Sequence, residues 1–423
     1  MLSQEDNDRL TLVGPGQPAG ELFRRYWIPA LLSSELPEND GAPLRVRLLG
    51  EDLLAFRDSM GRVGLVDSHC PHRGAPLFFG RNEECGLRCI YHGWKFDTEG
   101  TCVDMPSEPD DSRFREKVRL KAYPTVERGG MVWTYMGPPE SQPGPPDFEW
   151  LRAPETHRHI SKVYERCNYL QALEGGLDSS HSSFVHNERL GDNQHLRNRD
   201  KSPVIEVEPT DYGFRASSTR RVDDESRYVR VYNYVLPSNQ FRAGTTQRTG
   251  GRYPVPKLDG HIWVPIDDHH TWVYNWAYSY DSTTPLTPEY METWDRKDGR
   301  APDEFIPGTF ELKQNIFNDY QIDRDVQKTK TFSGIKGVNT QDYALQEGMG
   351  PIVDRTREHL GTSDRTVIAM RRMLLEAVSA VEQGDRPKGA DPALTSAIRP
   401  YDDVISADAD WREVFAGEMI AKW

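Results

Sequence analysis

Four soft metal ligands in a stretch of 23 residues constrain this chain more than any other feature of its sequence. Cys70 and His72 flank one proline, Cys89 and His92 flank two residues, and 16 residues separate His72 from Cys89. Each of two short loops therefore offers one thiolate and one imidazole. Such pairing is rare among unrelated core residues, so the sequence predicts a metal centre that joins the two loops.

Both a zinc ion and an iron–sulfur cluster accept this set of donors. Zinc binds two cysteines and two histidines in a tetrahedron. A Rieske [2Fe-2S] cluster places two cysteines on one iron and two histidines on the other, which raises its reduction potential. Pro71, Gly74 and Gly93 favour turns that let backbone N–H groups approach the sulfides. We therefore favour the cluster and keep a structural zinc site as the alternative.

The composition favours a metal-binding protein of a reducing compartment. Five cysteines, at 70, 85, 89, 102 and 167, are too few for a disulfide framework. The formal net charge of −14 argues against nucleic acid and anionic membranes as partners. The chain has no apolar run long enough to span a bilayer, and its polar start, MLSQEDNDRL, lacks a signal-peptide pattern. We expect a soluble cytoplasmic protein.

Strand and turn signals divide the chain into domains. From residue 44 to 136, short alternating strands predict a small antiparallel β domain with the ligand loops at its tips. The prolines of GPPESQPGPPD then exclude regular structure. We expect a lead-in at 1–43 that packs on the catalytic domain, a cluster domain at 44–140, a proline-rich joint at 141–147 and a catalytic domain at 148–423.

The catalytic domain is predicted to contain one extended antiparallel sheet flanked by helices. Strand-like runs occupy 204–222, 227–237 and 261–280. The clearest helix is predicted at 363–384, with Ser363 as its N-cap, an apolar stripe and a glycine at its end. We interpret DDHH at 267–270 as a hairpin turn, although its composition would suit a metal.

A second candidate metal site lies in DSSHSSFVH, residues 178–186. His181 and His186, with one carboxylate, would form a 2-His-1-carboxylate site for Fe(II) that leaves positions open for O2 and substrate. Both imidazoles reach one metal only if the helix ends or bends between them, because five residues rotate about 140° past one turn. Asp178 shares the predicted helix face of His181 and could fix its tautomer. Glu174 is either a further carboxylate near the iron or a solvated acid.

The third ligand has to come from far downstream. Asp342 shares a helical stripe with Leu345, Gln346 and Met349, so it is an acid on an otherwise buried face, where iron would be a partner. We favour Asp342 and keep Asp354 as the alternative.

Taken together, these segments resemble a known family. C-P-H-R-G, C-I-Y-H-G-W and D-S-S-H-S-S-F-V-H are similar to the motifs of Rieske non-haem iron aromatic-ring-hydroxylating oxygenases. GELFRRYWIPALLSSELPE and MGPIVDRTREHLG extend the resemblance over most of the chain. It looks closest to α-subunits of the phthalate and phenoxybenzoate dioxygenase branch, which is related to aryl-ether O-demethylases. The resemblance implies an α+β fold: a small antiparallel β Rieske domain and a larger helix-flanked antiparallel sheet of the helix-grip, START-like type.

The resemblance also implies cofactors and partners. A separate reductase, with or without a ferredoxin, would take electrons from NAD(P)H. The [2Fe-2S] cluster would store one electron, and a mononuclear Fe(II) would use O2 to hydroxylate an aromatic carboxylate. Asp178 would join this iron to His72 or His92 of a neighbouring subunit. The expected assembly is a homo-oligomer, either a trimer or stacked trimers.

Aromatic and basic side chains on the predicted sheet suit an aromatic carboxylate. They are Tyr232, Tyr234, Trp263, Trp276, Arg215, Arg220, Arg221, Arg230 and Arg242. Most of these arginines are expected to be exposed strand residues, so none is assigned to substrate. Ring cis-dihydroxylation is the expected reaction, and O-demethylation of a methoxylated aromatic or biphenyl acid is the alternative. An alternative of another class is a zinc-stabilised ligand-binding protein without catalysis.

Overall fold

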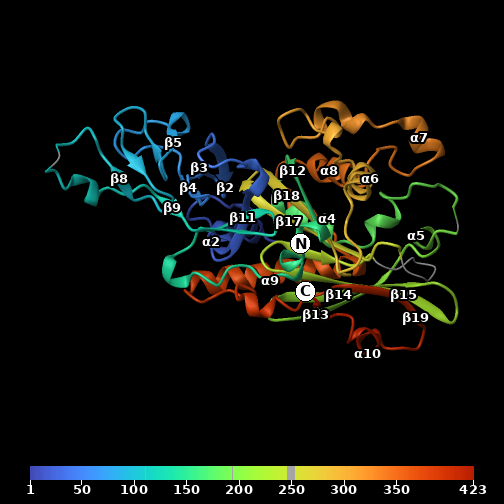
Figure 1. Ribbon diagram of the computed structural model, residues 1–423. Helices are drawn as coiled ribbons and strands as arrows, with labels where there is room; N and C mark the ends of the chain where they lie inside the picture. Colours follow the sequence, from blue (N-terminus) through green and yellow to red (C-terminus); the bar gives the residue numbers. More distant parts are fainter. Residues whose placement is uncertain (110, 193, 245–252) are drawn as a thin grey trace.

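The computed structural model describes residues 1–109, 111–192, 194–244 and 253–423. Figure 1 shows a small β-rich part of the chain, called the cluster domain below, beside a larger part, called the catalytic domain, in which helices flank a broad sheet. This architecture confirms the predicted α+β fold. None of the described helices combines the length and the apolar character needed to cross a membrane.

Two four-stranded antiparallel sheets form the cluster domain. The first has the order β2-β3-β4-β9, with strands Leu44–Leu48, Glu51–Arg57, Val63–Asp67 and Ala122–Tyr123. The second has the order β5-β6-β7-β8, with strands Arg81–Glu83, Gly86–Arg88, Lys95–Phe96 and Cys102–Asp104. The first ligand loop precedes β5 and the second joins β6 to β7, so both loops flank the second sheet.

The lead-in contacts both domains. Its strand β1 (Trp27–Leu32) pairs with β11 (Met131–Tyr135), which in turn pairs with β10 (Thr125–Arg128). Its helices α1 (Gln4–Thr11) and α2 (Pro18–Phe23) pack instead against α9 (Arg365–Glu382) of the catalytic domain. The lead-in therefore links the cluster domain to the catalytic domain through a sheet on one side and helices on the other.

An eight-stranded antiparallel sheet forms the centre of the catalytic domain. Its order is β12-β18-β17-β16-β15-β14-β13, and β19 pairs with the half of β15 that β16 leaves open. In chain order, strands β12 to β19 are Arg158–Glu165, Val204–Pro209, Gly213–Arg221, Ser226–Val235, Asn239–Arg242, Lys257–Asp267, His270–Ser279 and Tyr401–Ser406. The predicted strand runs are confirmed, and Asp267 pairs with His270 at the predicted hairpin turn.

Helix α9 confirms the helix predicted at 363–384, with a difference at its start. The apolar stripe is buried and consists of Val367, Met370, Leu374, Val378 and Val381. The residues Thr362–Asp364 form a 3₁₀ turn, so the N-cap is Asp364 and not Ser363. Gly384, with φ of +85°, follows the helix as predicted.

Two helices hold the candidate site over the sheet. These are α4 (Tyr169–Leu177) and α8 (Val338–Gly348), and α6 (Pro288–Asp298) packs beside α8. A Cβ on Gly176 would lie 2.2 Å from the ring of Trp263, and one on Gly175 would lie 2.2 Å from the side chain of Gln346. The glycine pair therefore lets α4 lie close to both β17 and α8. The remaining short helices are α3 Glu149–Arg152, α5 Leu196–Arg199, α7 Arg324–Thr329 and α10 Trp411–Phe415.

Candidate active site and metal centres

The two predicted cluster loops share one backbone hydrogen-bond pattern. In each loop the N–H of the cysteine, Cys70 or Cys89, donates to the carbonyl five residues later, at 2.8 Å in both cases. The N–H of the following glycine, Gly74 or Gly93, donates back to the cysteine carbonyl at 2.9 Å in both cases. The glycines have φ of +70° and +79°, in the region that favours glycine. The loops therefore present their ligands in matching turns.

The ligand side chains of the two loops converge. The ring centroids of His72 and His92 lie 4.4 Å apart, and Trp94 stacks on His72 at 4.2 Å. Cys70 and Cys89 are buried. Burial, together with the neighbouring Cys89 thiol, raises the pKa of Cys70 to about 11. Nδ1 of His92 is buried without a hydrogen-bond partner. An unpaired imidazole nitrogen beside two buried thiols fits a group that takes up thiolates and imidazoles together.

The predicted iron segment lies directly after α4. Asp178 is the C-cap of α4 and has extended backbone angles, and His181 begins a separate 3₁₀ turn, His181–Ser183. The expected common helix face of Asp178 and His181 is therefore wrong, because the chain turns between them. The helix was expected to end or bend between His181 and His186. Helix α4 instead ends at Leu177, before both histidines, and only the short 3₁₀ turn ends between them.

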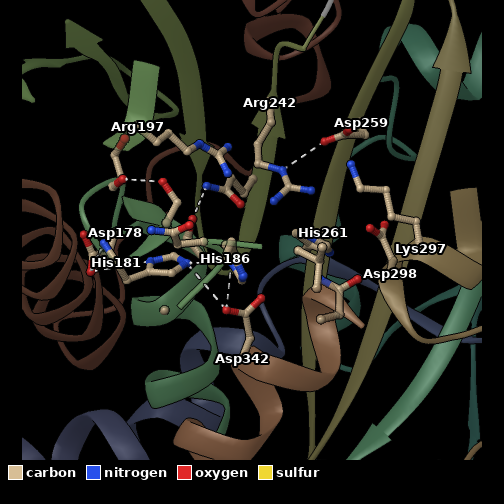
Figure 2. Close-up of a pocket in the computed structure, with 18 of the residues that line it drawn as sticks. Asp178, His181, His186, Arg197, Arg242, Asp259, His261, Lys297, Asp298 and Asp342 are labelled. Atoms are coloured by element: carbon tan, nitrogen blue, oxygen red, sulfur yellow. Dashed lines mark hydrogen bonds and ion pairs between the residues drawn. The ribbon is translucent and has the colours of Figure 1, made fainter. Parts of the chain in front are cut away.

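His181, His186 and Asp342 meet at one point beside the sheet (Figure 2). The Nε2 atoms of His181 and His186 lie 3.1 Å apart. Oδ1 of Asp342 lies 3.5 Å from Nε2 of His181 and 3.3 Å from Nε2 of His186. Within the described part of the chain, they are the one group of three or more metal-binding side chains whose ligand atoms all lie within 4.8 Å of one another. The fold thus brings Asp342, from a distant part of the chain, to the histidine pair that the sequence proposed.

The outer nitrogens of both imidazoles face oxygen atoms. Nδ1 of His186 lies 2.8 Å from Oε1 of Gln341, whose amide is oriented by its own hydrogen bond to the carbonyl of Ile335. Nδ1 of His181 lies 3.5 Å from Oδ2 of Asp178. Protons on these Nδ1 atoms leave the Nε2 lone pairs facing each other and the Asp342 carboxylate. These lone pairs and the carboxylate repel one another unless a cation lies between them, so the three side chains fit a metal ion.

The charges around the site favour a cation. Burial alone would raise the pKa of Asp342, but the neighbouring imidazoles of His186 and His181 lower it overall. Burial alone would lower the pKa of His181, but Asp178 and Asp342 raise it overall. The pKa of Asp178 is likewise lowered by His181 against the effect of burial. Both carboxylates are therefore ionised beside the histidines.

Helix α8 presents Asp342 from a different face than predicted. Leu345 and Met349 of the predicted apolar stripe are 48% and 58% exposed, so that part of the argument is wrong. Gln346 is buried as predicted, and the adjacent Glu347 is also buried. The buried face of α8 is polar because it faces the candidate site and carries side chains that hydrogen-bond there, such as Gln341. Asp342 itself lines the adjoining cavity.

Two other acids that the sequence offered have structural roles. Asp354 is exposed and accepts hydrogen bonds from Thr356 in its own 3₁₀ turn. Glu174 lies between two buried arginines, with its oxygens 2.9 and 3.0 Å from Arg355 and 2.6 Å from Arg371. Both proposed roles for Glu174 are therefore wrong: it is an ion-pair partner in the core, because its partners come from distant parts of the chain.

A cavity of about 560 Å³ opens beside the three candidate ligands. Its floor is one face of the sheet, where every second residue of a strand points inward. Figure 2 shows Arg242 and His261 reaching this space from β16 and β17, across from Asp342 on α8. Tyr232 and Trp263 add aromatic surface to the lining. The cavity therefore combines an aromatic floor, cationic groups and the candidate iron site.

Only four of the nine aromatic and basic residues that the sequence proposed for the substrate line the cavity. Those that line the cavity are Arg230, Arg242, Tyr232 and Trp263. Tyr234 and Trp276 are buried in the core, Arg215 pairs with Glu208, Arg220 bonds the carbonyls of Asp200 and Ser179, and Arg221 pairs with Asp224 at the surface. Sequence reasoning missed His261, Asn339 and Gln341, because single polar residues in buried elements carry no local pattern.

Comparison with known families identifies the class of protein. Residues 26–124 match the Rieske [2Fe-2S] domain, and residues 134–422 match the family described as LigXa C-terminal domain like. The chain therefore belongs to the Rieske non-haem iron oxygenases.

Several relatives of the chain are oxygenase subunits. The chain is 40% identical to the phthalate 4,5-dioxygenase oxygenase subunit of Pseudomonas putida, over 98% of this chain and 94% of the relative. It is 38% identical to the 3-chlorobenzoate-3,4-dioxygenase oxygenase subunit of Comamonas testosteroni, over 93% of each chain. It is 34% identical to the 5,5'-dehydrodivanillate O-demethylase oxygenase subunit of a Sphingobium species, over 94% of this chain and 86% of the relative.

Solved structures share the fold. NdmA of Pseudomonas putida CBB5, as the QL mutant with theobromine, superimposes with a TM-score of 0.63 at 20% identity, covering 92% of this chain and 99% of that chain. Dicamba monooxygenase bound to dicamba gives a TM-score of 0.60 at 19% identity, covering 85% and 98%.

The predicted family resemblance is confirmed by these comparisons. The protein is an oxidoreductase, and its cofactors are a Rieske [2Fe-2S] cluster and a mononuclear non-haem iron. Membership of this class excludes the alternative of a zinc-stabilised binding protein without catalysis.

Proposed function

We propose that this chain is a terminal oxygenase that cis-dihydroxylates the ring of an aromatic carboxylate. Two arginines, Arg230 and Arg242, line the same cavity as the candidate iron ligands, and this observation carries the proposal. When bound, the iron activates O2 and the cluster supplies single electrons. The reaction consumes the aromatic acid, O2, two electrons and two protons and forms a cis-dihydrodiol.

The protein holds both arginines through their Nε atoms. Nε of Arg242 donates to Oδ1 of Asp259 at 2.9 Å, and Nζ of Lys257 donates to the other oxygen at 2.6 Å. Lys257 and Arg242 outweigh the effect of burial and lower the pKa of Asp259 far below its usual value. Nε of Arg230 donates to the carbonyl of Ala243 at 2.6 Å. Among the described residues, the hydrogen bonds of both guanidinium groups use Nε and not the terminal nitrogens. A carboxylate could bind there in a bidentate manner.

We assign the site residues separate tasks. His181, His186 and Asp342 hold the iron, and Cys70, His72, Cys89 and His92 hold the cluster. Gln341 fixes the tautomer of His186 through the 2.8 Å hydrogen bond. Asp178 orients His181, and its side chain is 25% exposed, so a neighbouring subunit can reach it. The aromatic rings of Tyr232 and Trp263 contact the substrate ring and exclude water.

The assembly follows from the role of Asp178. We propose a homo-oligomer, a trimer or stacked trimers, in which Asp178 meets His72 or His92 of the adjacent subunit. In Figure 1, β5 and β8 of the cluster domain lie apart from α4 and α8, the helices next to the candidate iron ligands, and this separation within one chain supports the arrangement. A reductase, with or without a ferredoxin, delivers electrons from NAD(P)H in the cytoplasm.

O-demethylation of a methoxylated aromatic or biphenyl acid is the second candidate reaction. The observation that favours it is the 34% identity to a relative named as an O-demethylase oxygenase subunit, over 94% of this chain. The same iron ligands serve both reactions. The position of the substrate carbon nearest to the iron decides between them.

Turnover with labelled oxygen tests the proposal. The purified chain and a reconstituted reductase are supplied with NADH, ¹⁸O2 and a panel of phthalates, phenoxybenzoates and methoxylated benzoates. Two labelled oxygens in a dihydrodiol support ring dihydroxylation. Formaldehyde with a phenol product supports demethylation. Failure to convert any aromatic acid, with both metal centres filled, would refute the proposed substrate class.

A further inference from the structure

His261 lines the cavity but belongs to neither proposed metal centre. It comes from the middle of β17, on the inward face that also carries Asp259 and Trp263. Its ring is 5% exposed and packs 5.3 Å from the ring of Trp263. A histidine so placed contacts whatever occupies the cavity.

The neighbouring strand determines the tautomer of His261. Asn275 is its cross-strand partner on β18, and Nδ1 of His261 lies 2.7 Å from Oδ1 of Asn275. The Asn275 amide is oriented because its Nδ2 donates to the carbonyl of Val273 at 3.5 Å, so Oδ1 is the atom that faces the imidazole. Nδ1 therefore carries the proton and donates it to Asn275. Nε2 is left as a hydrogen-bond acceptor.

Burial and the surrounding charges favour a neutral ring for His261. Burial lowers the pKa of His261 well below its usual value, and the cations Arg242 on β16 and Arg300 after α6 lower it further. Asp259 and the hydrogen bond to Asn275 act in the opposite direction but do not outweigh these effects. From α8, Asp342 is also close enough to interact with the imidazole. No described residue donates a hydrogen bond to Nε2 of His261.

We propose that Nε2 of His261 accepts a hydrogen bond from a hydroxyl group on the substrate ring, so that the preferred substrate is a hydroxylated aromatic carboxylate. This inference rests on the proposed function, because it assumes that an aromatic acid occupies the cavity. The arginines bind the carboxylate, and His261 selects the ring substituent. Only a hydroxyl at this position can donate a hydrogen bond to Nε2, so a hydroxyl strengthens binding, whereas a methoxyl or a hydrogen does not.

This assignment also constrains the demethylation alternative. A methoxyl oxygen can accept a hydrogen bond but cannot donate one. The methoxyl group of such a substrate therefore lies toward the iron, and a separate hydroxyl on the ring meets His261.

Calorimetric binding to the fully loaded enzyme under anaerobic conditions tests the inference. The probes are benzoate with its 2-, 3- and 4-hydroxy and methoxy derivatives, and phthalate with its 3- and 4-hydroxy and methoxy derivatives. For at least one position, we expect the hydroxy acid to bind about tenfold more tightly than both its methoxy and its unsubstituted counterparts. In His261→Leu this ratio falls to near one. In His261→Gln, which retains an acceptor oxygen, part of the ratio returns.

The matched control is Arg242→Leu, which should weaken all the acids while leaving the ratio of hydroxy to unsubstituted acid in place. Iron content, the cluster spectrum and thermal unfolding verify that each variant is folded and loaded. Equal binding of hydroxy, methoxy and unsubstituted acids by the wild type would overturn the role of His261 alone. An unchanged ratio in both His261 variants would do the same. Binding of no acid at all would refute the proposed substrate class together with the inference.

Discussion

The two metal centres are assembled in different ways. The candidate cluster ligands lie within 23 residues, on two loops with the same backbone hydrogen bonds. The candidate iron ligands come from a turn after α4 and from α8, far apart in the sequence. A local centre can be recognised from spacing alone. A centre built across the fold needs its supporting helices to be placed first.

The surroundings of the two histidine pairs differ as well. Burial, with the nearby charges of His72 and Arg73, lowers the pKa of His92. At the iron site, Asp178 and Asp342 raise the pKa of His181 against the effect of burial. Arg73 thus adds a positive charge beside His92, whereas the candidate iron site places two carboxylates beside His181. These settings suit a cluster with two thiolates in one case and a cation with open positions in the other.

Removing the distant carboxylate should separate the two centres most clearly. Asp342→Ala is expected to lose the mononuclear iron and to reduce turnover by more than about 100-fold, because two imidazoles alone hold the metal weakly. Its cluster spectrum should be unchanged. Iron analysis and electron paramagnetic resonance measure both centres.

Two controls accompany this variant. Cys89→Ser should give the reverse result, with loss of the cluster and retention of mononuclear iron. Asp354→Ala, at the exposed alternative acid, should change neither. Full iron occupancy in Asp342→Ala would show that another carboxylate is the ligand.

A smaller effect is expected for the residue proposed to connect the two centres. Asp178→Asn removes the charge beside His181 while keeping the size of the side chain, so the iron should remain. Turnover should fall about 10- to 100-fold, which is usual for residues that orient metal ligands. Single-turnover oxidation of the reduced cluster locates the defect. Cluster oxidation at the wild-type rate would contradict a role in transfer between subunits.

Replacing Gln341, which supports His186, should have a weaker effect on the candidate iron site than replacing Asp178. Gln341→Leu removes the acceptor that lies 2.8 Å from Nδ1 of His186. We expect the affinity for Fe(II) to fall about tenfold, with the cluster unaffected, in a competition titration with a chelator. Gln341→Glu keeps an acceptor and should retain most of the affinity. Equal affinities in all three proteins would argue against the assigned tautomer.

The ion pairs beneath α4 should affect stability more than chemistry. Glu174→Gln leaves Arg355 and Arg371 without their shared carboxylate, so we expect a loss of about 3 kcal/mol in the free energy of unfolding, measured in urea. Burial alone would raise the pKa of Glu174, but the two arginines lower it overall from its ordinary value of 4.5. Its contribution is therefore complete above pH 4.5 and is lost as the pH falls through the lowered value.

A surface ion pair provides the control for that measurement. Glu376, 60% exposed and 3.6 Å from Arg372, should change stability by less than about 0.5 kcal/mol when replaced by Gln. The difference between wild type and Glu174→Gln should narrow in acid. A difference that widens below pH 4.5 would contradict the assigned ionisation.

Regular elements with an apolar pattern were predicted well, and polar elements were not. The stripe of α9 is buried as expected, since its only task is packing. The interpretation of α8 failed in part, because this helix turns polar residues such as Gln341 and Gln346 toward the site and leaves Leu345 exposed. Strand β19 was missed, because YDDVIS is too polar to stand out. Functional elements depart from the usual pattern, so pattern reasoning fails where they occur.

The sequence by itself determined the class of the protein, and it indicated the four candidate cluster ligands and the histidine pair of the candidate iron site. These residues lie in short motifs, as near neighbours along the chain. Only the tertiary structure decided that Asp342 meets the two histidines, that Glu174 serves the core, and that His261 faces the cavity as an acceptor. Each of these depends on a partner from a distant segment, and a side chain acquires its charge state and its neighbours only when the fold brings that partner to it.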